Sequence, residues 1–316
     1  MTATKPKIGG VKIGPLREPE LAEAGRIVRL AFGTFLGIPD PLTFMGDRDL
    51  WTPRYRASNV KVLAARLEGR LIGISVATRW GAFGYFGPVV VLPEFWDKGV
   101  AQQLLAPTVK LLDRWGVRYS GLFTFAHSAK HVGLYQKFGY WPQRLTALMS
   151  HTPPEGAGAE PPILLSAMHR TEREQYILAC AQLTGRIDKG LDLTGEIRSL
   201  LAQRGGDVVL VFTRSTLEGF ALCFTGAGTE GGSTACYIKF GAARHGKAFD
   251  QLLAACDAFA AGRGVPIEAG MNLESEDAYR RMRAHGYRAS NQGVLMLRPN
   301  KPGFNRPDTY VIADLR

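Results

Sequence analysis

The chain has 316 residues, of which 46% are hydrophobic and 21% charged, and its formal net charge is +11 at pH 7. This composition is typical of a globular protein and excludes a fibrous or disordered chain, and the length predicts about two domains. The first residues have no apolar signal segment, and no apolar run approaches the roughly 20 residues of a membrane span. The four cysteines form no C-x-x-C pair. We therefore expect a cytoplasmic protein with reduced core thiols, no membrane partner and no bound metal.

The positive charge is concentrated in the first half of the chain. Residues 1–150 hold 20 Lys and Arg against 10 Asp and Glu, whereas residues 151–316 hold 19 against 18. A basic surface attracts an anion, and nucleic acid is one candidate. The sequence has no Lys/Arg run, no RGG segment and no zinc-finger spacing, so it favours a small molecule that carries a polyphosphate over a nucleic acid.

The apolar pattern of the first 150 residues predicts strands and helices in a recognisable order. The expected strands are 11–16, 60–67, 71–78, 84–92, 119–125 and 140–149, and the expected helices are 18–33, a short one within 34–57, 102–115 and 130–138. Gly33 and Gly139 are placed to end two of the helices. A hairpin-rich start followed by β-α-β-α-β predicts an α/β fold, a mixed sheet with helices on both faces.

Residues 151–162, rich in Pro, Gly and Ala, predict a linker between one domain at 1–150 and another at 163–316. The same element order recurs after the linker. The expected strands are 163–168, 208–213, 219–224, 235–240, 266–269 and 294–298, and the expected helices are 172–183, 193–201, 245–261 and 276–285. This recurrence predicts two tandem copies of one fold, followed by an extension whose residues 310–312 can add an edge strand.

The first candidate site is the passage from the strand at 84–92 into the following helix. The connecting loop contains Lys98 and Gly99. The free N–H groups and the dipole of a helix start suit a phosphate, and glycine lets a ligand approach the backbone. An ordinary β-α connection would use the same residue types.

Two motifs of the first half resemble those of the GNAT superfamily of acyl-CoA-dependent N-acyltransferases. The family's Arg/Gln-x-x-Gly-x-Gly/Ala loop, after a strand that ends in Val-x-Pro, stands here as Val91-Leu92-Pro93 followed by Trp96-Asp97-Lys98-Gly99-Val100-Ala101. The family's Tyr-x-x-x-Gly-Phe/Tyr motif stands as Tyr135-Gln136-Lys137-Phe138-Gly139-Tyr140. The resemblance covers about residues 8–150. It implies a GNAT fold and an N-acetyltransferase that moves an acetyl group from acetyl-CoA to a primary amine by direct attack.

This chain departs from the family pattern at three positions. Trp96 replaces the usual Arg or Gln, Asp97 places a negative charge beside the expected phosphates, and Ser128 stands where the family often has Asn. The backbone N–H donors of the loop are unaffected. These departures bear on the affinity for CoA more than on the identity of the site.

The resemblance implies roles for particular residues. The pantetheine amides would pair with the backbone around Val89 and Val91, and the pyrophosphate would lie on the N–H groups of residues 98–101, namely Lys98, Gly99, Val100 and Ala101, with Ser128 nearby. An N–H near Val91 would stabilise the oxyanion. Tyr135 would act as general acid toward the departing thiolate, although on an isolated helix it would be interpreted as a core tyrosine.

The resemblance leaves the general base open, because the strand at 84–92 contains no carboxylate. His127 is the first candidate and His131 the second, since an ordinary histidine pKa near 6.5 suits proton transfer. A surface histidine or a chain of waters are the alternatives. Three carboxylates could hold a cationic amine or simply belong to a solvated loop; they are Asp40, Asp47 and Asp49.

The second copy keeps the later motif, with Asn272, Tyr279 and His285-Gly286-Tyr287, but its phosphate loop differs. Lys247 and Phe249 stand where the first copy has Gly99 and Ala101. We expect this degenerate copy not to bind acyl-CoA, and to complete the acceptor pocket or serve as scaffold. The acceptor is expected to be a small-molecule or peptide amine, and a homodimer is left open. The alternatives are a longer acyl-CoA donor, or a non-catalytic module that binds acyl-CoA or nucleic acid.

Overall fold

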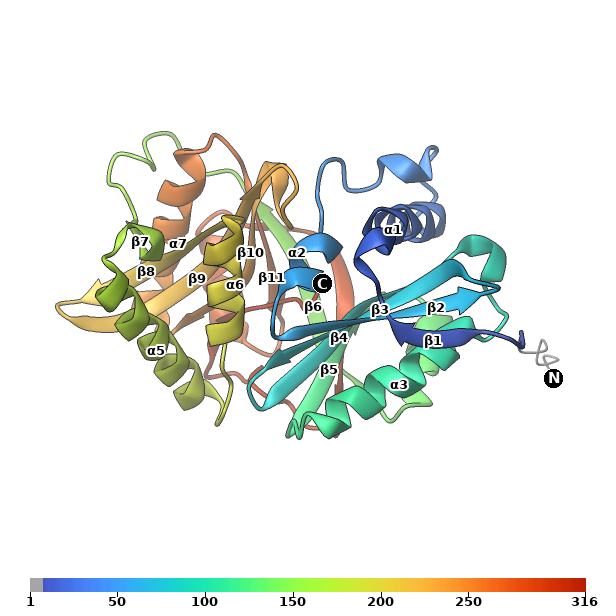
Figure 1. The fold of residues 1–316 in the computed structure, drawn as a ribbon. Helices are drawn as coiled ribbons and strands as arrows, with labels where there is room; N and C mark the ends of the chain where they lie inside the picture. Colours follow the sequence, from blue (N-terminus) through green and yellow to red (C-terminus); the bar gives the residue numbers. More distant parts are fainter. Residues whose placement is uncertain (1–7) are drawn as a thin grey trace.

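The computed structural model describes residues 8–316, which form one mixed sheet with helices on both faces (Figure 1). Residues 1–7, on which the expectation of no secretory signal partly rests, lie outside this description. The strands are β1 (Lys12–Pro15), β2 (Val60–Leu67), β3 (Arg70–Trp80), β4 (Phe83–Val91), β5 (Tyr119–Thr124), β6 (Trp141–His151), β7 (Ile163–Leu164), β8 (Gly206–Thr213), β9 (Thr216–Gly226), β10 (Gly232–Ala243), β11 (Ile267–Asn272), β12 (Arg288–Arg298) and β13 (Tyr310–Ile312). The helices are α1 (Leu21–Phe35), α2 (Trp51–Arg56), α3 (Val100–Arg114), α4 (Ala129–Gln136), α5 (Arg170–Ile187), α6 (Thr194–Gln203), α7 (Gly246–Ala261) and α8 (Glu276–Ala284), with short 3-10 turns η1 (Glu18–Glu20), η2 (Pro41–Thr43), η3 (Pro93–Phe95) and η4 (Leu165–Ala167).

The two copies of the fold lie side by side in a single 13-stranded sheet. Its order is β1-β2-β3-β4-β5-β12-β6-β11-β10-β9-β8-β7, with β13 paired to β10 beside that path. In the first copy β4 is antiparallel to β3 and parallel to β5, and in the second β10 is antiparallel to β9 and parallel to β11. The expected α/β class and the tandem duplication are therefore confirmed.

The last strand of each copy lies next to strands of the other copy. β6 precedes the linker but pairs with β11, whereas β12 comes from the second copy and pairs with β5. β6 and β12 also pair with each other at the centre of the sheet. The division into domains at 1–150 and 163–316 stays a prediction. Because of the strand exchange, main-chain hydrogen bonds cross this predicted domain boundary.

A shared hydrophobic core also joins the two copies. Trp80 and Phe83 from β3 and β4 lie in the same buried cluster as Leu191 and Phe240 from the second copy. The ring centroids of Trp80 and Phe240 are 5.4 Å apart in an edge-on arrangement. Because burial of apolar surface is the main driving force of folding, we expect the two copies to stabilise each other.

Helices α1 and α3 hold β4 from opposite faces of the sheet, as Figure 1 shows. Each has one apolar face at helical spacing. The buried apolar residues are Ala24, Ile27, Val28 and Ala31 in α1, and Val100, Leu104, Leu105, Val109 and Leu112 in α3. This packing fixes the end of β4 directly before the loop that begins α3. Among the helices of the described residues, none is long and apolar enough to cross a membrane.

Two local predictions are corrected by the structure, and a third is confirmed. Gly33 does not end its helix, since α1 continues to Phe35, and a Cβ at Gly33 would lie 2.5 Å from the Pro41 backbone. Gly33 therefore allows close packing of the α1–η2 connection. The strand expected at 163–168 is only β7, because a 3-10 turn begins at Leu165. The expected edge strand at 310–312 exists as β13, which pairs with β10.

Candidate functional site

Strands β4 and β5 diverge within the first copy. They pair only from Phe83 to Tyr85 on β4, although β4 continues to Val91. Beyond Tyr85 no described strand pairs with this edge of β4. A bulge against β3, between the pairs Ser75–Val89 and Ala77–Phe86, lies where the two strands part.

The backbone of Val89 and Val91 faces this divergent edge. The N–H of Leu92 donates to the carbonyl of Ile72 at 2.9 Å, so Leu92 faces β3. Because successive strand residues direct their backbone groups to opposite sides, Val91 and Val89 direct theirs away from β3. The carbonyl of Val91 accepts a hydrogen bond from the Trp96 indole nitrogen at 2.7 Å. Trp96 thus ties the loop to β4 in place of the polar side chain that the family pattern has.

The loop that follows β4 ends in a left-handed glycine. Gly99 has φ +77° and is the N-cap of α3, so a side chain there would be strained. Val100 and Ala101 form the first turn of α3, whose N–H groups have no acceptor within the helix. Lys98 is exposed, with its amine 5.2 Å from the ring centroid of Phe95. The expected phosphate-binding backbone is thus present as a helix start with a close-approach glycine.

The unfavourable charge of Asp97 has a partner from the second motif. Lys130 on α4 lies 2.5 Å from the Asp97 carboxylate. The ion pair reduces its negative potential and connects the loop to α4. Ser128 is the N-cap of α4, and its hydroxyl accepts from the His131 N–H at 3.4 Å.

Tyr135 lies on α4 against the divergent part of β4. Its side chain is buried, and its ring centroid is 5.8 Å from that of Phe86, the first β4 residue beyond the β5 pairing. Burial raises the pKa of Tyr135 to about 12, with the Thr124 hydroxyl acting in the opposite direction. The phenol therefore keeps its proton at neutral pH and can donate it.

The two candidate bases lie together in a cluster of aromatic rings. The Phe35 ring centroid is 6.3 Å from that of His127 and 5.0 Å from that of His131, and Phe125 contacts both imidazoles. His127 is exposed. Burial, and to a smaller extent the charges of Lys130 and His127, lowers the pKa of His131. Its buried Nδ1 has no hydrogen-bond partner among the described residues.

The three loop carboxylates have local roles as hydrogen-bond acceptors. Asp40 accepts from the Leu42 N–H, and Asp49 accepts from the N–H groups at the start of α2. Asp47 accepts from the Ser233 N–H at 3.1 Å and so connects the two copies. Hydrogen bonding to Ser233 is the main reason why the pKa of Asp47 is lowered. Each of the three carboxylates therefore accepts hydrogen bonds within its loop or at the interface between the two copies.

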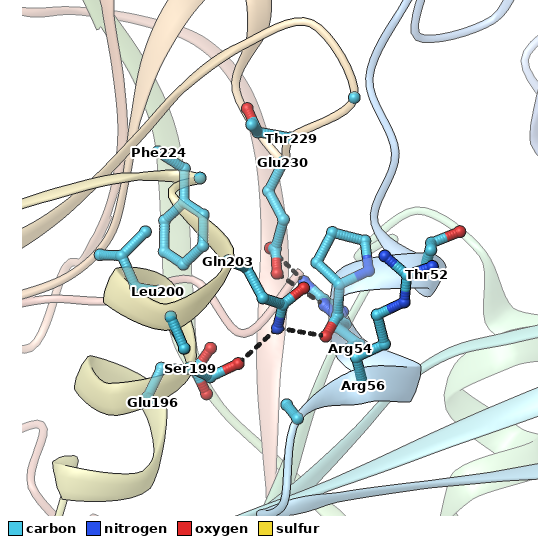
Figure 2. Close-up of a pocket in the computed structure, with 15 residues that line it drawn as sticks. Thr52, Arg54, Arg56, Glu196, Ser199, Leu200, Gln203, Phe224, Thr229 and Glu230 are labelled. Carbon is cyan, nitrogen blue, oxygen red and sulfur yellow. Dashed lines mark hydrogen bonds and ion pairs between the residues drawn. The ribbon is translucent and has the colours of Figure 1, made fainter.

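The structure adds a cavity that the sequence analysis did not identify (Figure 2). It measures about 310 Å³ and lies between α2, α6 and the loop between β9 and β10. Arg54, Glu196 and Glu230 line it, together with Gln203 and Phe224. Arg54 also donates to the Gly87 carbonyl on β4 at 3.0 Å. One guanidinium therefore contacts both the cavity and the bulged part of β4.

The charged residues at this cavity form a buried network. Arg54 makes two hydrogen bonds to Glu230, at 3.0 and 2.6 Å, and Lys239 bridges Glu230 and Glu196 at 2.7 and 2.6 Å. All four residues are less than 5% exposed. The only sequence signal was Lys239, which interrupts the apolar run of β10. The partners come from distant parts of the chain, so spacing could not reveal them.

In the second copy the corresponding divergence is filled. β10 pairs with β11 only from Cys236 to Ile238, and its residues 241–243 then pair with β13. Phe249 is fully buried, and a Cβ on Gly246 would lie 2.4 Å from the Arg281 guanidinium. The backbone edge that is unpaired in β4 is therefore occupied here by the chain's own C-terminal extension.

The chain is similar to a known family in sequence and to solved proteins in structure. The model of the acetyltransferase (GNAT) family matches residues 32–140. No curated protein sequence matches the chain significantly. A proposed acetyltransferase from Pyrococcus horikoshii has a similar structure, with a TM-score of 0.71 and 14% identity over 97% of this chain and 95% of that one.

Two further solved structures resemble the whole chain. A GCN5-related N-acetyltransferase from Sphaerobacter thermophilus has a TM-score of 0.59 at 16% identity, over 96% of this chain and 100% of that one. A tandem GNAT protein from the clavulanic acid biosynthesis pathway has a TM-score of 0.57 at 13% identity, over 91% and 98%. At these identities the likeness shows the tandem fold.

Proposed function

Since the first copy is an acyltransferase domain of the GNAT family, we propose that the protein transfers an acetyl group from acetyl-CoA to a primary amine. The observation that carries this proposal is the unpaired edge of β4 that leads directly into the left-handed Gly99 at the start of α3. The acceptor is a small-molecule or peptide amine. The four free, buried cysteines support a reducing, cytoplasmic location.

The residues present fit the donor. Backbone groups of Val89 and Val91 suit the amides of a pantetheine arm, and the N–H groups of Gly99, Val100 and Ala101 suit a pyrophosphate. Lys98 adds positive charge beside them, and Ser128 lies at the start of the neighbouring helix α4. Acetyl-CoA supplies an activated thioester.

Two side chains would move the protons. Tyr135 keeps its proton at neutral pH and would give it to the leaving thiolate. His127 would take the proton of the attacking ammonium, with His131 beside the same Phe35 ring as the second candidate. The N–H of Val91 faces the divergent edge, where it would stabilise an oxyanion.

The proposal is tested with the full chain in two steps. Calorimetric titration should show that acetyl-CoA binds, and a thiol-release assay should show turnover with at least one member of a panel of amines, amino acids and peptides. Acetyl-CoA and longer acyl-CoA donors are compared in the same assay. A protein that binds no acyl-CoA would refute the enzyme assignment.

The Tyr135→Phe variant then tests the general acid. We expect kcat to fall by about 10²-fold or more, because the thiolate would leave without a proton donor. Tyr140→Phe is the matched control, because Tyr140 lies in the same core cluster as Tyr135. The Tyr140 hydroxyl lies 2.8 Å from the Ser120 hydroxyl. If Tyr135→Phe turns over like Tyr140→Phe, Tyr135 is not the acid.

A further inference from the structure

Three side chains of metal-ligand type meet where the exchanged strand β6 contacts α7 and α8. They are His151 at the end of β6, Asp257 on α7 and His285 at the end of α8. One ligand atom of each lies within 4.8 Å of the others. The His151 and His285 Nε2 atoms are 3.3 and 2.8 Å from the same Asp257 oxygen, Oδ2.

A second observation points to a missing ligand at this place. The other carboxylate oxygen, Asp257 Oδ1, is buried and has no hydrogen-bond partner among the described residues, and the Asp257 side chain is only 5% exposed. The Tyr287 hydroxyl is likewise buried without a partner, and the Tyr287 ring stacks on His151 with centroids 4.8 Å apart. Unsatisfied buried polar atoms are rare in folded proteins, and an ion is one of the explanations for them.

We propose that His151, Asp257 and His285 bind a divalent transition metal, with Zn²⁺ as the best fit. Two imidazole nitrogens and one carboxylate oxygen are ligands that Zn²⁺ prefers, at distances of about 2.0–2.2 Å. Ligand atoms of a tetrahedral zinc site lie about 3.3 Å apart by that geometry. The His151–Asp257 distance already has this value, the His285–Asp257 distance is 2.8 Å, and all three ligand atoms lie within 4.8 Å of one another.

Access and charge also fit this assignment. The His285 side chain is 24% exposed, so an ion can enter from its side and a water can complete the coordination. A metal would let both imidazoles bind in their neutral form, and it would balance the Asp257 carboxylate. Among the described residues, the only hydrogen-bond partners of this carboxylate are the two histidine Nε2 atoms, and both lie at one of its two oxygens.

The site would act on the architecture rather than on the acetyl transfer. Its ligands are 106 and 28 residues apart in sequence, and one of them belongs to the strand that crosses into the other copy. A metal there would fasten the end of β6 to α7 and α8. Metal binding to the native state alone stabilises it by RT ln(1 + L/Kd), where L is the free metal concentration.

The test uses the untagged full chain after treatment with a chelator. Zn²⁺ is added in a calorimetric titration and a thermal melt, and Co²⁺ provides an absorption spectrum. We expect one ion per chain, a melting temperature several degrees higher with Zn²⁺, and a Co²⁺ spectrum typical of nitrogen and oxygen ligands. His285→Gln should weaken binding at least tenfold, because an amide can still hydrogen-bond to Asp257 but is a poor zinc ligand.

His169→Ala is the matched control, since His169 is an exposed histidine at the start of α5 that lies outside the cluster. It should bind Zn²⁺ like the parent. His285 lies at a partly exposed helix end, so its variant can be checked for native circular dichroism before titration. Absence of saturable binding, equal affinity in His285→Gln, or thiolate-to-cobalt bands from the buried cysteines would each overturn the proposal.

Discussion

At the scale of single residues, His127 and His131 differ in environment although they contact the same Phe35 ring. His127 is exposed, whereas His131 is partly buried and burial lowers its pKa. A base must be neutral to accept a proton. A lowered pKa keeps His131 neutral to more acidic pH than an ordinary histidine, whose pKa is about 6.5.

This difference gives a prediction for the pH profile. If His127 is the base, we expect His127→Gln to lower kcat/KM by about 10²-fold and His131→Gln to leave it largely unchanged. An acidic limb that lies clearly below 6.5, and that is lost only in His131→Gln, would assign the proton acceptor to His131 instead. Stopped assays of kcat/KM across pH 5–9 would decide between them.

Trp96 illustrates how a departure from a motif is accommodated. The motif residue that it replaces is polar, and the sequence left open how Trp96 affects the affinity for CoA. The structure shows that its indole N–H donates to the Val91 carbonyl. Trp96 therefore holds the loop in register with β4, and it leaves the N–H of Val91 facing the divergent edge.

At the scale of elements, α3 is flanked by two glycines in the left-handed region. Gly99 precedes it with φ +77° and Gly116 follows it with φ +65°. An alanine Cβ is strained in this region by about 1–2 kcal/mol. Nothing lies within 4 Å of a Cβ at Gly116, so backbone strain is the only expected cost there.

The pair Gly99→Ala and Gly116→Ala separates folding from donor binding. Both variants should lose about 1 kcal/mol of unfolding free energy in urea. Only Gly99→Ala should weaken acetyl-CoA binding, by about tenfold or about 1.4 kcal/mol. The reason is that the positions of the Val100 and Ala101 N–H groups depend on the backbone conformation of Gly99. If the two variants had equal dissociation constants for acetyl-CoA, the start of α3 would not belong to the phosphate site.

Also at this scale, the two copies differ in one strand. The divergent edge of β4 is unpaired by any described strand, whereas the equivalent edge of β10 is paired with β13. This difference supports the expectation that only the first copy binds acyl-CoA. The second copy instead contributes α6 and the loop between β9 and β10 to the cavity of Figure 2.

At the scale of the whole molecule, the buried network of Arg54, Glu230, Lys239 and Glu196 joins the two copies. Burial alone raises the pKa of Glu230, but the charges of Arg54 and Lys239 outweigh it and lower the pKa to about 2. A lowered folded pKa stabilises the native state above the ordinary value of 4.5. That contribution is lost as the pH falls from there toward 2.

Glu230→Gln should therefore destabilise the whole chain. Removing one partner of a buried pair leaves Arg54 uncompensated, at a cost of about 3–5 kcal/mol of unfolding free energy at pH 7. The matched control is Glu174→Gln, because Glu174 and Arg198 form an ion pair at 2.9 Å in which both side chains are more than half exposed. We expect that control to change stability by less than about 1 kcal/mol in urea titrations. Similar losses for both variants would mean that the buried network does not hold the copies together.

The sequence by itself determined the local parts of this protein. Apolar periodicity placed most helices and strands, the recurrence of their order gave the tandem fold, and two motifs around Gly99 and Tyr135 carried the resemblance to the GNAT superfamily. These features depend on residues that are close in the chain, where side-chain spacing and backbone preference act directly.

Only the tertiary structure decided how distant segments meet. It placed β6 and β12 in exchanged positions, filled the second divergence with β13, and brought Arg54 to Glu230. It also gathered His151, Asp257 and His285, although the sequence had led us to expect no metal. Strand order and buried charge pairing depend on which surfaces pack together. The spacing of residues along the sequence does not reveal this.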